Sequence, residues 1–212
     1  MKTRAFRFWQ AICLSGLLGI SSLYAQNSEA DYVPAPENLQ ARKEFQDSKF
    51  GIFLHWGIYS MFGQGEWYMH NVDIDCHEYA KVASGFYPSR FNAHDWVAAI
   101  KASGAKYICF TSRHHDGFSM YNSACSDYNI VKCTPFAKDP LKELAEACKK
   151  EGIKLGLYYS LGRDWEDPDV PTNWPVKAGR SNTWDYPDED SKQLPAYIER
   201  KVKPQLKELL TN

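Results

Sequence analysis

Three short apolar runs divide the chain and predict three buried strands. They cover residues 50–56, 107–111 and 153–159, and the first of them is bounded by glycines. Short continuous runs of apolar and aromatic residues are typical of strands that are covered on both faces. We therefore expect the protein to be built around a sheet that contains these three segments.

Apolar positions at helical spacing follow each predicted strand. Residues 95–103 predict a helix that Gly104 ends. A third helix is expected over residues 196–210, where Pro204 either kinks the helix or marks a restart. The apolar positions of this last helix are expected to be Tyr197, Val202, Leu206, Leu209 and Leu210.

The helix between these two has clear signals at both ends. Asp139 is a typical N-cap, Pro140 suits the first helical position, and Gly152 ends the segment. We expect the apolar face of this helix to consist of Leu141, Leu144, Ala145 and Cys148.

Alternating strands and helices predict an α/β fold with parallel strands and crossover helices. No glycine-rich GxGxxG or GxxxxGK[ST] motif follows a strand, which disfavours a nucleotide-binding sheet. Three parallel strands do not close a barrel, and a complete (β/α)8 TIM-like barrel takes about 250 residues. We expect residues 26–212 to be the N-terminal part of such a barrel, about the first three βα units, with the rest of the barrel beyond Asn212.

The first residues have the composition of an export signal. Basic residues precede an uncharged apolar run over residues 11–23, and small residues lead up to Ala25. We therefore expect residues 1–25 to be a secretory signal peptide, which implies a periplasmic, secreted or lysosome-like location. An uncleaved anchor is the alternative, although the run is shorter than the roughly 20 residues of a membrane span.

The charges of the chain are nearly balanced, with 25 basic and 26 acidic side chains and a net charge of -1. Residues 1–25 hold three basic and no acidic side chains, so 25 − 3 = 22 basic side chains remain against 26 after cleavage, a net charge of -4. Nucleic acids and anionic membranes usually need a basic surface, so we expect neither as a partner. The aromatic content of 15% favours a ligand with apolar faces, such as a sugar.

Five cysteines follow residue 25, and no two of them have CxxC spacing. The odd number and the spacing argue against a zinc knuckle and against a complete disulfide framework. Cys125 and Cys133 flank a polar stretch, so a disulfide between them is the one pairing that the sequence suggests.

Polar and aromatic residues gather where each predicted strand ends. His55 and Trp56 end the first strand, residues 113–118 follow the second, and Tyr158 ends the third, with residues 163–167 just beyond. In a parallel barrel the functional groups lie at the carboxyl ends of the strands. We therefore expect these three strand ends to contribute to one site.

Two loop features strengthen this prediction. His114 and His115 are neighbours, and the Asp-Gly pair that follows them allows a turn that aims both rings at one ligand. The connection over residues 57–93 is far longer than a usual βα loop of about 2–6 residues, and it carries Glu66 and Trp67. Long loops of this kind commonly carry function.

Each group also has a structural interpretation. His55 alone can serve the fold as a hydrogen-bonding residue, and His114 and His115 can belong to a polar turn. The loop around Glu66 can simply face solvent, and residues 164–166 can form a solvated turn. The remaining histidines are expected to be surface or structural residues: His70, His77 and His94.

A metal-dependent hydrolase site is a further alternative, with His55, His114, His115 and Asp116 as ligands. The first strand, however, offers His-Trp-Gly rather than His-x-His, and adjacent histidines coordinate one ion awkwardly. Neutral imidazoles, each with one donor and one acceptor, suit sugar hydroxyls better. We expect no metal and no other cofactor.

Four motifs occur together in one order: Lys-Phe-Gly-Ile-Phe-Leu-His-Trp-Gly over residues 49–57, Gly-Glu-Trp-Tyr over 65–68, Arg-His-His-Asp-Gly-Phe over 113–118 and Gly-Leu-Tyr-Tyr-Ser over 156–160. The ordered set resembles the α-L-fucosidases of glycoside hydrolase family 29. The resemblance implies a barrel followed by a β-sandwich, and a retaining hydrolase that releases terminal α-L-fucose from glycans or glycoconjugates. It also implies that the residues in contact with fucose are His55, Glu66, Trp67, His114, His115 and Tyr158.

The same resemblance places the catalytic carboxylates outside this chain. The nucleophile of the family is an Asp at the end of the next strand, and its acid/base lies further on. Neither is expected before Asn212, so we expect the isolated chain to be inactive and Glu66 not to be the nucleophile. The alternatives to a fucosidase fragment are a non-catalytic fucose-binding module and, less favoured, the metal-dependent hydrolase.

Overall fold

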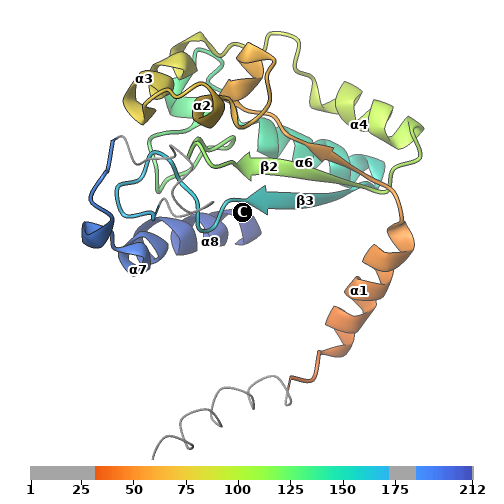
Figure 1. Cartoon of the computed structure of the whole chain (residues 1–212). Helices are drawn as coiled ribbons and strands as arrows, with labels where there is room; N and C mark the ends of the chain where they lie inside the picture. Colours follow the sequence, from red (N-terminus) through yellow and green to blue (C-terminus); the bar gives the residue numbers. More distant parts are fainter. Residues whose placement is uncertain (1–31, 172–184, 212) are drawn as a thin grey trace, which may run out of the picture. The chain divides into compact units, whose positions relative to one another are not determined.

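A parallel sheet of three strands organises the protein (Figure 1). In this computed structural model the strands are β1 (Gly51–Leu54), β2 (Tyr107–Arg113) and β3 (Lys154–Tyr159), in the spatial order β1-β2-β3. All pairs are parallel and in register from their first residues, since Gly51 pairs with Tyr107 and Tyr107 with Lys154. The predicted α/β class with a parallel sheet is confirmed.

The structure describes residues 32–171 and 185–211. The expected signal peptide lies outside the described residues. The chain divides into two compact units, Met1–Asp47 and Ser48–Asn212. The first unit contains most of α1 (Pro36–Ser48), a helix that buries no side chain and that we did not predict. Among the described residues, no helix is long and apolar enough to cross a membrane.

Helices α4 (Ala93–Ala102) and α6 (Pro140–Glu151) pack on the sheet and form its main core. Val97 of α4 and Leu144 of α6 are completely buried in the same cluster as Ile108 of β2. Figure 1 shows α6 running along β2 and β3. Ile108 and Phe110 of β2 are therefore completely buried, as an apolar strand covered by helices requires, whereas Phe53 of β1 is 50% exposed.

The limits of α6 agree with the prediction. The side chain of Asp139 accepts a hydrogen bond from the backbone N–H of Lys142 at 2.9 Å, and Gly152 ends the helix with a φ of 70°. The predicted apolar face is wrong at one position, because Ala147 is buried and Ala145 is exposed. Ala147 is one helical turn after Leu144, so it lies on the same side of the helix.

The C-terminal segment is helical throughout but changes its winding. It consists of α7 (Leu194–Tyr197), a π-helical turn, η5 (Ile198–Val202), and α8 (Lys203–Thr211). Pro204 has no N–H to donate to the carbonyl of Arg200, so the wider π turn just before it replaces the expected kink. Leu210, predicted as an apolar contact, is 78% exposed, whereas the polar Gln205 is completely buried.

The long connection after β1 is folded into short helical turns. None of them is long enough to give a periodic hydrophobic pattern, which is why the sequence did not predict them. They are η1 (Ile58–Phe62), α2 (Tyr68–Asn71), α3 (Cys76–Ala80) and η2 (Lys81–Gly85), and similar turns later in the chain are α5 (Ile130–Cys133) and η4 (Glu189–Ser191).

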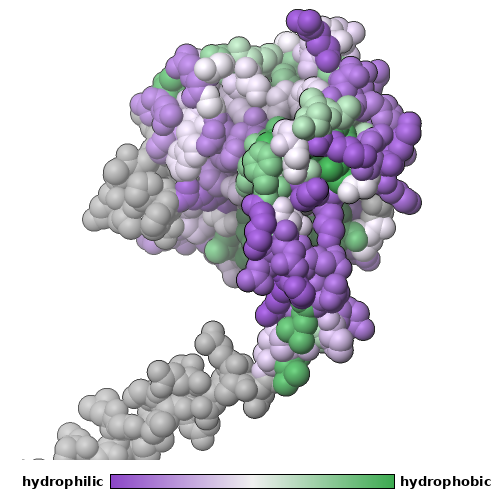
Figure 2. All heavy atoms as spheres, turned by 90° about the vertical axis from the view of Figure 1, so that its right-hand side faces the viewer, coloured by the Kyte–Doolittle hydropathy of each residue, from purple (hydrophilic) through white to green (hydrophobic). Residues whose placement is uncertain are grey.

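Figure 2 faces the ends at which the strands begin, and apolar atoms (green) gather there within hydrophilic surroundings. Phe50 and Phe53 at the sheet edge are 48% and 50% exposed.

Cys125 and Cys133 are free thiols, so the suggested disulfide is not formed. The Cys125 thiol instead donates to Glu208 at 3.1 Å.

Candidate functional site

The carboxyl ends of the three strands bring four rings together. The ring centroids of His55 and His114 are 5.5 Å apart, and those of His114 and Tyr158 are also 5.5 Å apart. His115 lies 4.2 Å from His114. Tyr158 pairs with Thr111 of β2, so its side chain shares one face of the sheet with the strand end that carries the histidines. The predicted meeting of the three strand ends is confirmed.

The alternation of β3 also decides between its two tyrosines. Tyr158 joins the histidine rings, whereas Tyr159 lies on the other face, where the Arg113 guanidinium is 4.4 Å from its ring centroid. Successive strand residues point to opposite faces, so only one of the pair can face the site. The choice of Tyr158 agrees with this geometry.

A tight turn aims both histidine rings. The N–H of Gly117 donates to the carbonyl of His114 at 3.1 Å, and Gly117 has a φ of 77°, a left-handed conformation that glycine adopts without strain. A Cβ atom at this position would lie 2.3 Å from Oδ1 of Asp164. The turn therefore needs glycine both for its conformation and for space.

The long connection after β1 adds Glu66 and Trp67 to the site. One ligand atom each of His55, Glu66 and His114 lie within 4.8 Å of one another. The Trp67 ring is 5.2 Å from the His115 ring and meets it edge to face. The structure thus brings together every residue that the family resemblance implied, while their contact with fucose stays a prediction.

Both adjacent histidines are neutral near physiological pH. Burial, followed by the neighbouring His115 and His55 rings, lowers the pKa of His114 to about 2. Burial, followed by the charge of Arg163, lowers the pKa of His115 to about 4. A neutral ring keeps one nitrogen as donor and one as acceptor, which suits the recognition of hydroxyl groups.

His115 is held in place by its own partners. Its Nδ1 forms a hydrogen bond with the Ser160 hydroxyl at 2.8 Å, and that hydroxyl donates to the Tyr158 hydroxyl at 3.2 Å. The Nδ1 of His114 is buried without a hydrogen-bond partner among the described residues. A buried polar atom left in this way is costly to the fold.

A buried ionic network of Asp164, Arg113 and Lys201 lies next to the turn that carries the histidine rings. Asp164 forms an ion pair with Arg113, and both side chains are completely buried. Lys201 of η5 lies 2.8 Å from the same carboxylate. Burial alone would raise the pKa of Asp164, but Arg113 and Lys201 hold it below its usual value. The alternative of a solvated turn over residues 164–166 is therefore wrong for Asp164, and also for Trp165, which is buried as well.

Trp165 links this network to the site. Trp165 is 2% exposed, and its backbone N–H donates to the backbone carbonyl of His115 at 2.7 Å. Its ring lies 5.4 Å from the Trp67 ring, and the half-buried His70 stacks on it at 5.7 Å. His70 is thus a supporting residue at the border of the site, whereas His77 and His94 are exposed.

Several supporting residues were missed by the sequence analysis. Ser160 belongs to a quoted motif, and Arg163 and Trp165 belong to a noted segment, but nothing in the pattern fixed their roles. Tyr197 and Lys201 come from a distant helical segment, so no local signal could place them. The Arg113 guanidinium donates to the Tyr197 hydroxyl at 2.5 Å.

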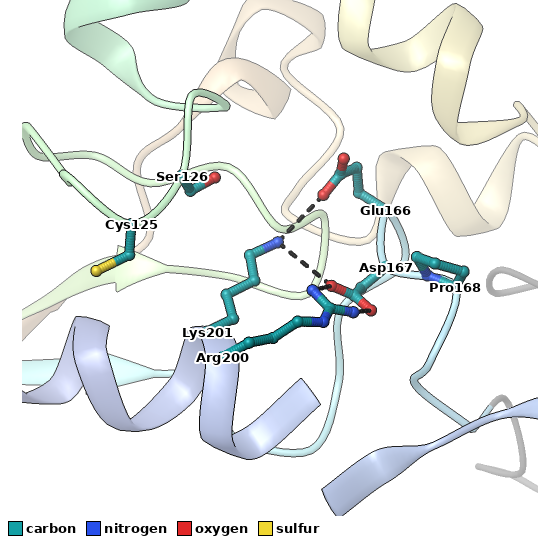
Figure 3. A pocket seen from close by; sticks show the side chains of 7 residues that line it. All are labelled: Cys125, Ser126, Glu166, Asp167, Pro168, Arg200 and Lys201. Carbon is teal, nitrogen blue, oxygen red and sulfur yellow. Dashed lines mark hydrogen bonds and ion pairs between the residues drawn. The ribbon is translucent and has the colours of Figure 1, made fainter. Parts of the chain in front are cut away.

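A depression in the surface lies beside the ionic network (Figure 3). It is lined by Cys125, Ser126, Glu166, Asp167, Pro168, Arg200 and Lys201. The cationic side chains in it already have anionic partners. Lys201 lies 3.1 Å from Glu166, and Arg200 lies 2.6 Å from Asp167. We interpret this depression as part of the structural network.

The predicted set of metal ligands is only partly assembled. The Asp116 carboxylate accepts from the Tyr79 hydroxyl at 3.1 Å and from the N–H of Phe118 at 3.2 Å, so it is not directed at the histidines. The alternative with Asp116 as a ligand is therefore wrong. His55, Glu66 and His114 are close enough to hold an ion, although a carboxylate and two imidazoles equally suit sugar hydroxyls.

Comparison with known proteins agrees with the four motifs. The family model described as alpha-L-fucosidase matches residues 20–212. The chain belongs to this α-L-fucosidase family. A putative α-L-fucosidase of Caenorhabditis elegans is 33% identical over 207 residues, which is 88% of this chain and 42% of the relative. The human plasma α-L-fucosidase is 34% identical over 165 residues, 67% of this chain and 34% of the relative.

Solved fucosidase structures have the same fold. The α-L-fucosidase AlfC from Lactobacillus casei, solved with its α-L-fucose product, matches with a TM-score of 0.75 at 39% identity. The match covers 80% of this chain and 58% of the AlfC chain. The α-L-fucosidase from Vibrio sp. strain EJY3 has a TM-score of 0.69 at 33% identity, with coverage of 82% and 30%. The chain thus spans well under two thirds of the length of these fucosidases.

Proposed function

We propose that this chain is part of an α-L-fucosidase and forms the portion of its active site that holds the sugar. The observation that carries the proposal is the meeting of His55, Glu66, His114, His115 and Tyr158 where three parallel strands end. These residues belong to the motifs shared with the family, and the Lactobacillus casei relative was solved with fucose.

The chemistry of the cluster supports a deoxy sugar as ligand. Neutral imidazoles and the Glu66 carboxylate offer the donors and acceptors that several hydroxyls need. The rings of Trp67 and Tyr158 offer apolar faces for the 6-methyl group of fucose. The substrate would be a fucosylated glycan or glycoconjugate.

We also propose that the three βα units are the first part of a (β/α)8 barrel. The parallel order β1-β2-β3, with helices α4 and α6 on the sheet, is the arrangement of consecutive barrel units. In this proposal the retaining carboxylate pair, which needs a separation of about 5–5.5 Å, comes from a part of the enzyme outside this chain. The exposed Phe50 and Phe53 would be covered by the remaining units.

The reaction is tested on the full-length protein with an aryl α-L-fucoside. We expect hydrolysis, with α-L-fucose as the first anomer seen by NMR, because retaining enzymes displace twice at the anomeric carbon. An aryl β-D-galactoside serves as the substrate control. Release of the β anomer would contradict the retaining mechanism.

The same assay separates the alternatives. Saturable binding of L-fucose without turnover by the full-length protein would favour the non-catalytic module. Loss of turnover with a chelator, restored by a divalent metal, would favour an ion at His55, Glu66 and His114. Export through residues 1–25 is also part of the proposal, and N-terminal sequencing of the secreted protein tests it.

A further inference from the structure

A second cluster of metal-binding side chains lies apart from the sugar site. Cys76 and His77 are the first two residues of α3, and Asp185 approaches them from more than a hundred residues further along the chain. One ligand atom of each, a thiol sulfur, an imidazole nitrogen and a carboxylate oxygen, lie within 4.8 Å of one another. The sugar site uses none of these residues.

The donor set is that of a zinc ion. Thiolate, imidazole and carboxylate are its usual protein ligands, at about 2.3 Å for sulfur and about 2.0–2.2 Å for nitrogen and oxygen. Tetrahedral coordination at these bond lengths places ligand atoms roughly 3.3–3.7 Å apart. A contraction of at most about 1.5 Å from the present spacing therefore closes the site, within reach of side-chain rotation at the exposed His77 and the half-buried Asp185.

The surroundings already orient two of the donors. The N–H of Cys76 donates to Oδ2 of Asp185 at 2.9 Å, which holds the carboxylate beside the sulfur. The Cys76 thiol, buried to 2% exposure, has the Tyr186 hydroxyl 3.8 Å away. Hydrogen bonds from outside the ligand set commonly fix metal ligands in this way.

We propose that Cys76, His77 and Asp185 bind one Zn²⁺ ion, with water as the fourth ligand. Binding forms a sulfur–zinc bond and releases the thiol proton to solvent. The ion would tie α3 to the segment around Asp185, and through Tyr186, whose hydroxyl donates to the Glu166 carbonyl at 3.1 Å, to the loop that carries Trp165. The site does not depend on the proposed fucosidase reaction.

The test uses Co²⁺ as a spectroscopic substitute for Zn²⁺ in the full-length protein. We expect one equivalent of Co²⁺ to give a near-ultraviolet sulfur-to-cobalt charge-transfer band, which Zn²⁺ then displaces. The cluster of His55, Glu66 and His114 contains no thiol, so this band cannot come from that cluster.

Variants assign the ligands. Cys76→Ser should abolish the band, and His77→Ala should weaken binding about tenfold or more; His77 is exposed, so its variant should fold even if the cysteine variant does not. Cys125→Ser removes an exposed thiol and Glu66→Gln alters the sugar site, and both should leave the band intact. A wild-type protein without the band, or a band that His77→Ala or Cys76→Ser leaves unchanged, overturns the proposal.

Discussion

Replacing Asp164 with asparagine should destabilise the protein strongly. Asp164 is completely buried, and its carboxylate faces the guanidinium of Arg113 and, at 2.8 Å, the ammonium of Lys201. Asparagine keeps the volume of the side chain, so no cavity forms and the lost charge is the main effect. Two buried cations are then left without this partner, and breaking a buried pair typically costs about 3–5 kcal/mol.

The assay is urea denaturation of the full-length protein, followed by tryptophan fluorescence. Trp165 is adjacent to the network and buried, so it reports on this region. With a slope near 2 kcal/mol/M, the expected loss lowers the midpoint by about 2 M. Asp127→Asn is the matched control, because Asp127 pairs with Lys132 at the surface and is 94% exposed, and its midpoint should not change.

A double variant tests the assignment to the ion pair itself. Arg113→Met together with Asp164→Asn should be less destabilising than the sum of the two single changes, by at least about 1 kcal/mol, because the partners are in contact. A loss below about 1 kcal/mol for Asp164→Asn, within the range of an ordinary surface pair, would refute the reasoning.

Three further predictions concern the sugar site and the chain as a whole. His114→Ala and His115→Ala should each lower kcat/KM of the full-length enzyme about 10- to 150-fold, whereas the exposed His94→Ala should not; equal losses in three folded variants would contradict the location of the site. Burial raises the pKa of Asp116 from 3.8 to about 7, so its contribution to stability is full below pH 3.8 and is lost as the pH rises to about 7. Asp116→Asn should remove this loss, about 1.4 kcal/mol per pH unit, in denaturation curves between pH 4 and 7; parallel curves for both proteins would argue against it. The isolated 212-residue chain should show negligible turnover of an aryl α-L-fucoside and poor solubility; activity within about tenfold of the full-length enzyme, or a sharp monomer peak with cooperative melting, would count against this.

The sequence predicted those parts of the fold that have a local signature. The strand runs, the Asp139 cap and the Gly152 stop are each set by a few neighbouring residues, and the structure has them where expected. The short turns after β1 were not predicted, because none of them is long enough to give a periodic pattern. The buried positions of the C-terminal helix were only partly predicted, because they depend on contacts with distant segments. Gln205 illustrates this, since a polar residue is buried there by hydrogen bonds to Ser119 and Ser123.

For the candidate site, the motifs identified the residues of the ring cluster but not the residues that hold them. His114, His115 and Tyr158 could be named because they end strands. Asp164 looked like part of a surface turn, since acidic residues in loops are usually solvated. Only the three-dimensional arrangement, which brings Arg113 and Lys201 to the same carboxylate, shows that its charge is compensated in the interior.

The π turn of η5 has a consequence for how this chain tolerates changes in length. Within it Arg200 and Lys201 reach Asp167 and Asp164, and beyond it, in α8, Glu208 reaches Ser123 at 2.8 Å. A π turn holds one residue more than the α-helical turn it replaces, and each helical residue corresponds to a rotation of about 100°. Deleting a single residue between 198 and 202 would therefore turn one half of the helix away from its partners. The number of residues in η5 therefore fixes how the two parts of the helix are rotated relative to each other. This rotation lets one part contact the loop after β3 while the other contacts the loop after β2, so we expect insertions or deletions here to be tolerated less well than substitutions of exposed side chains.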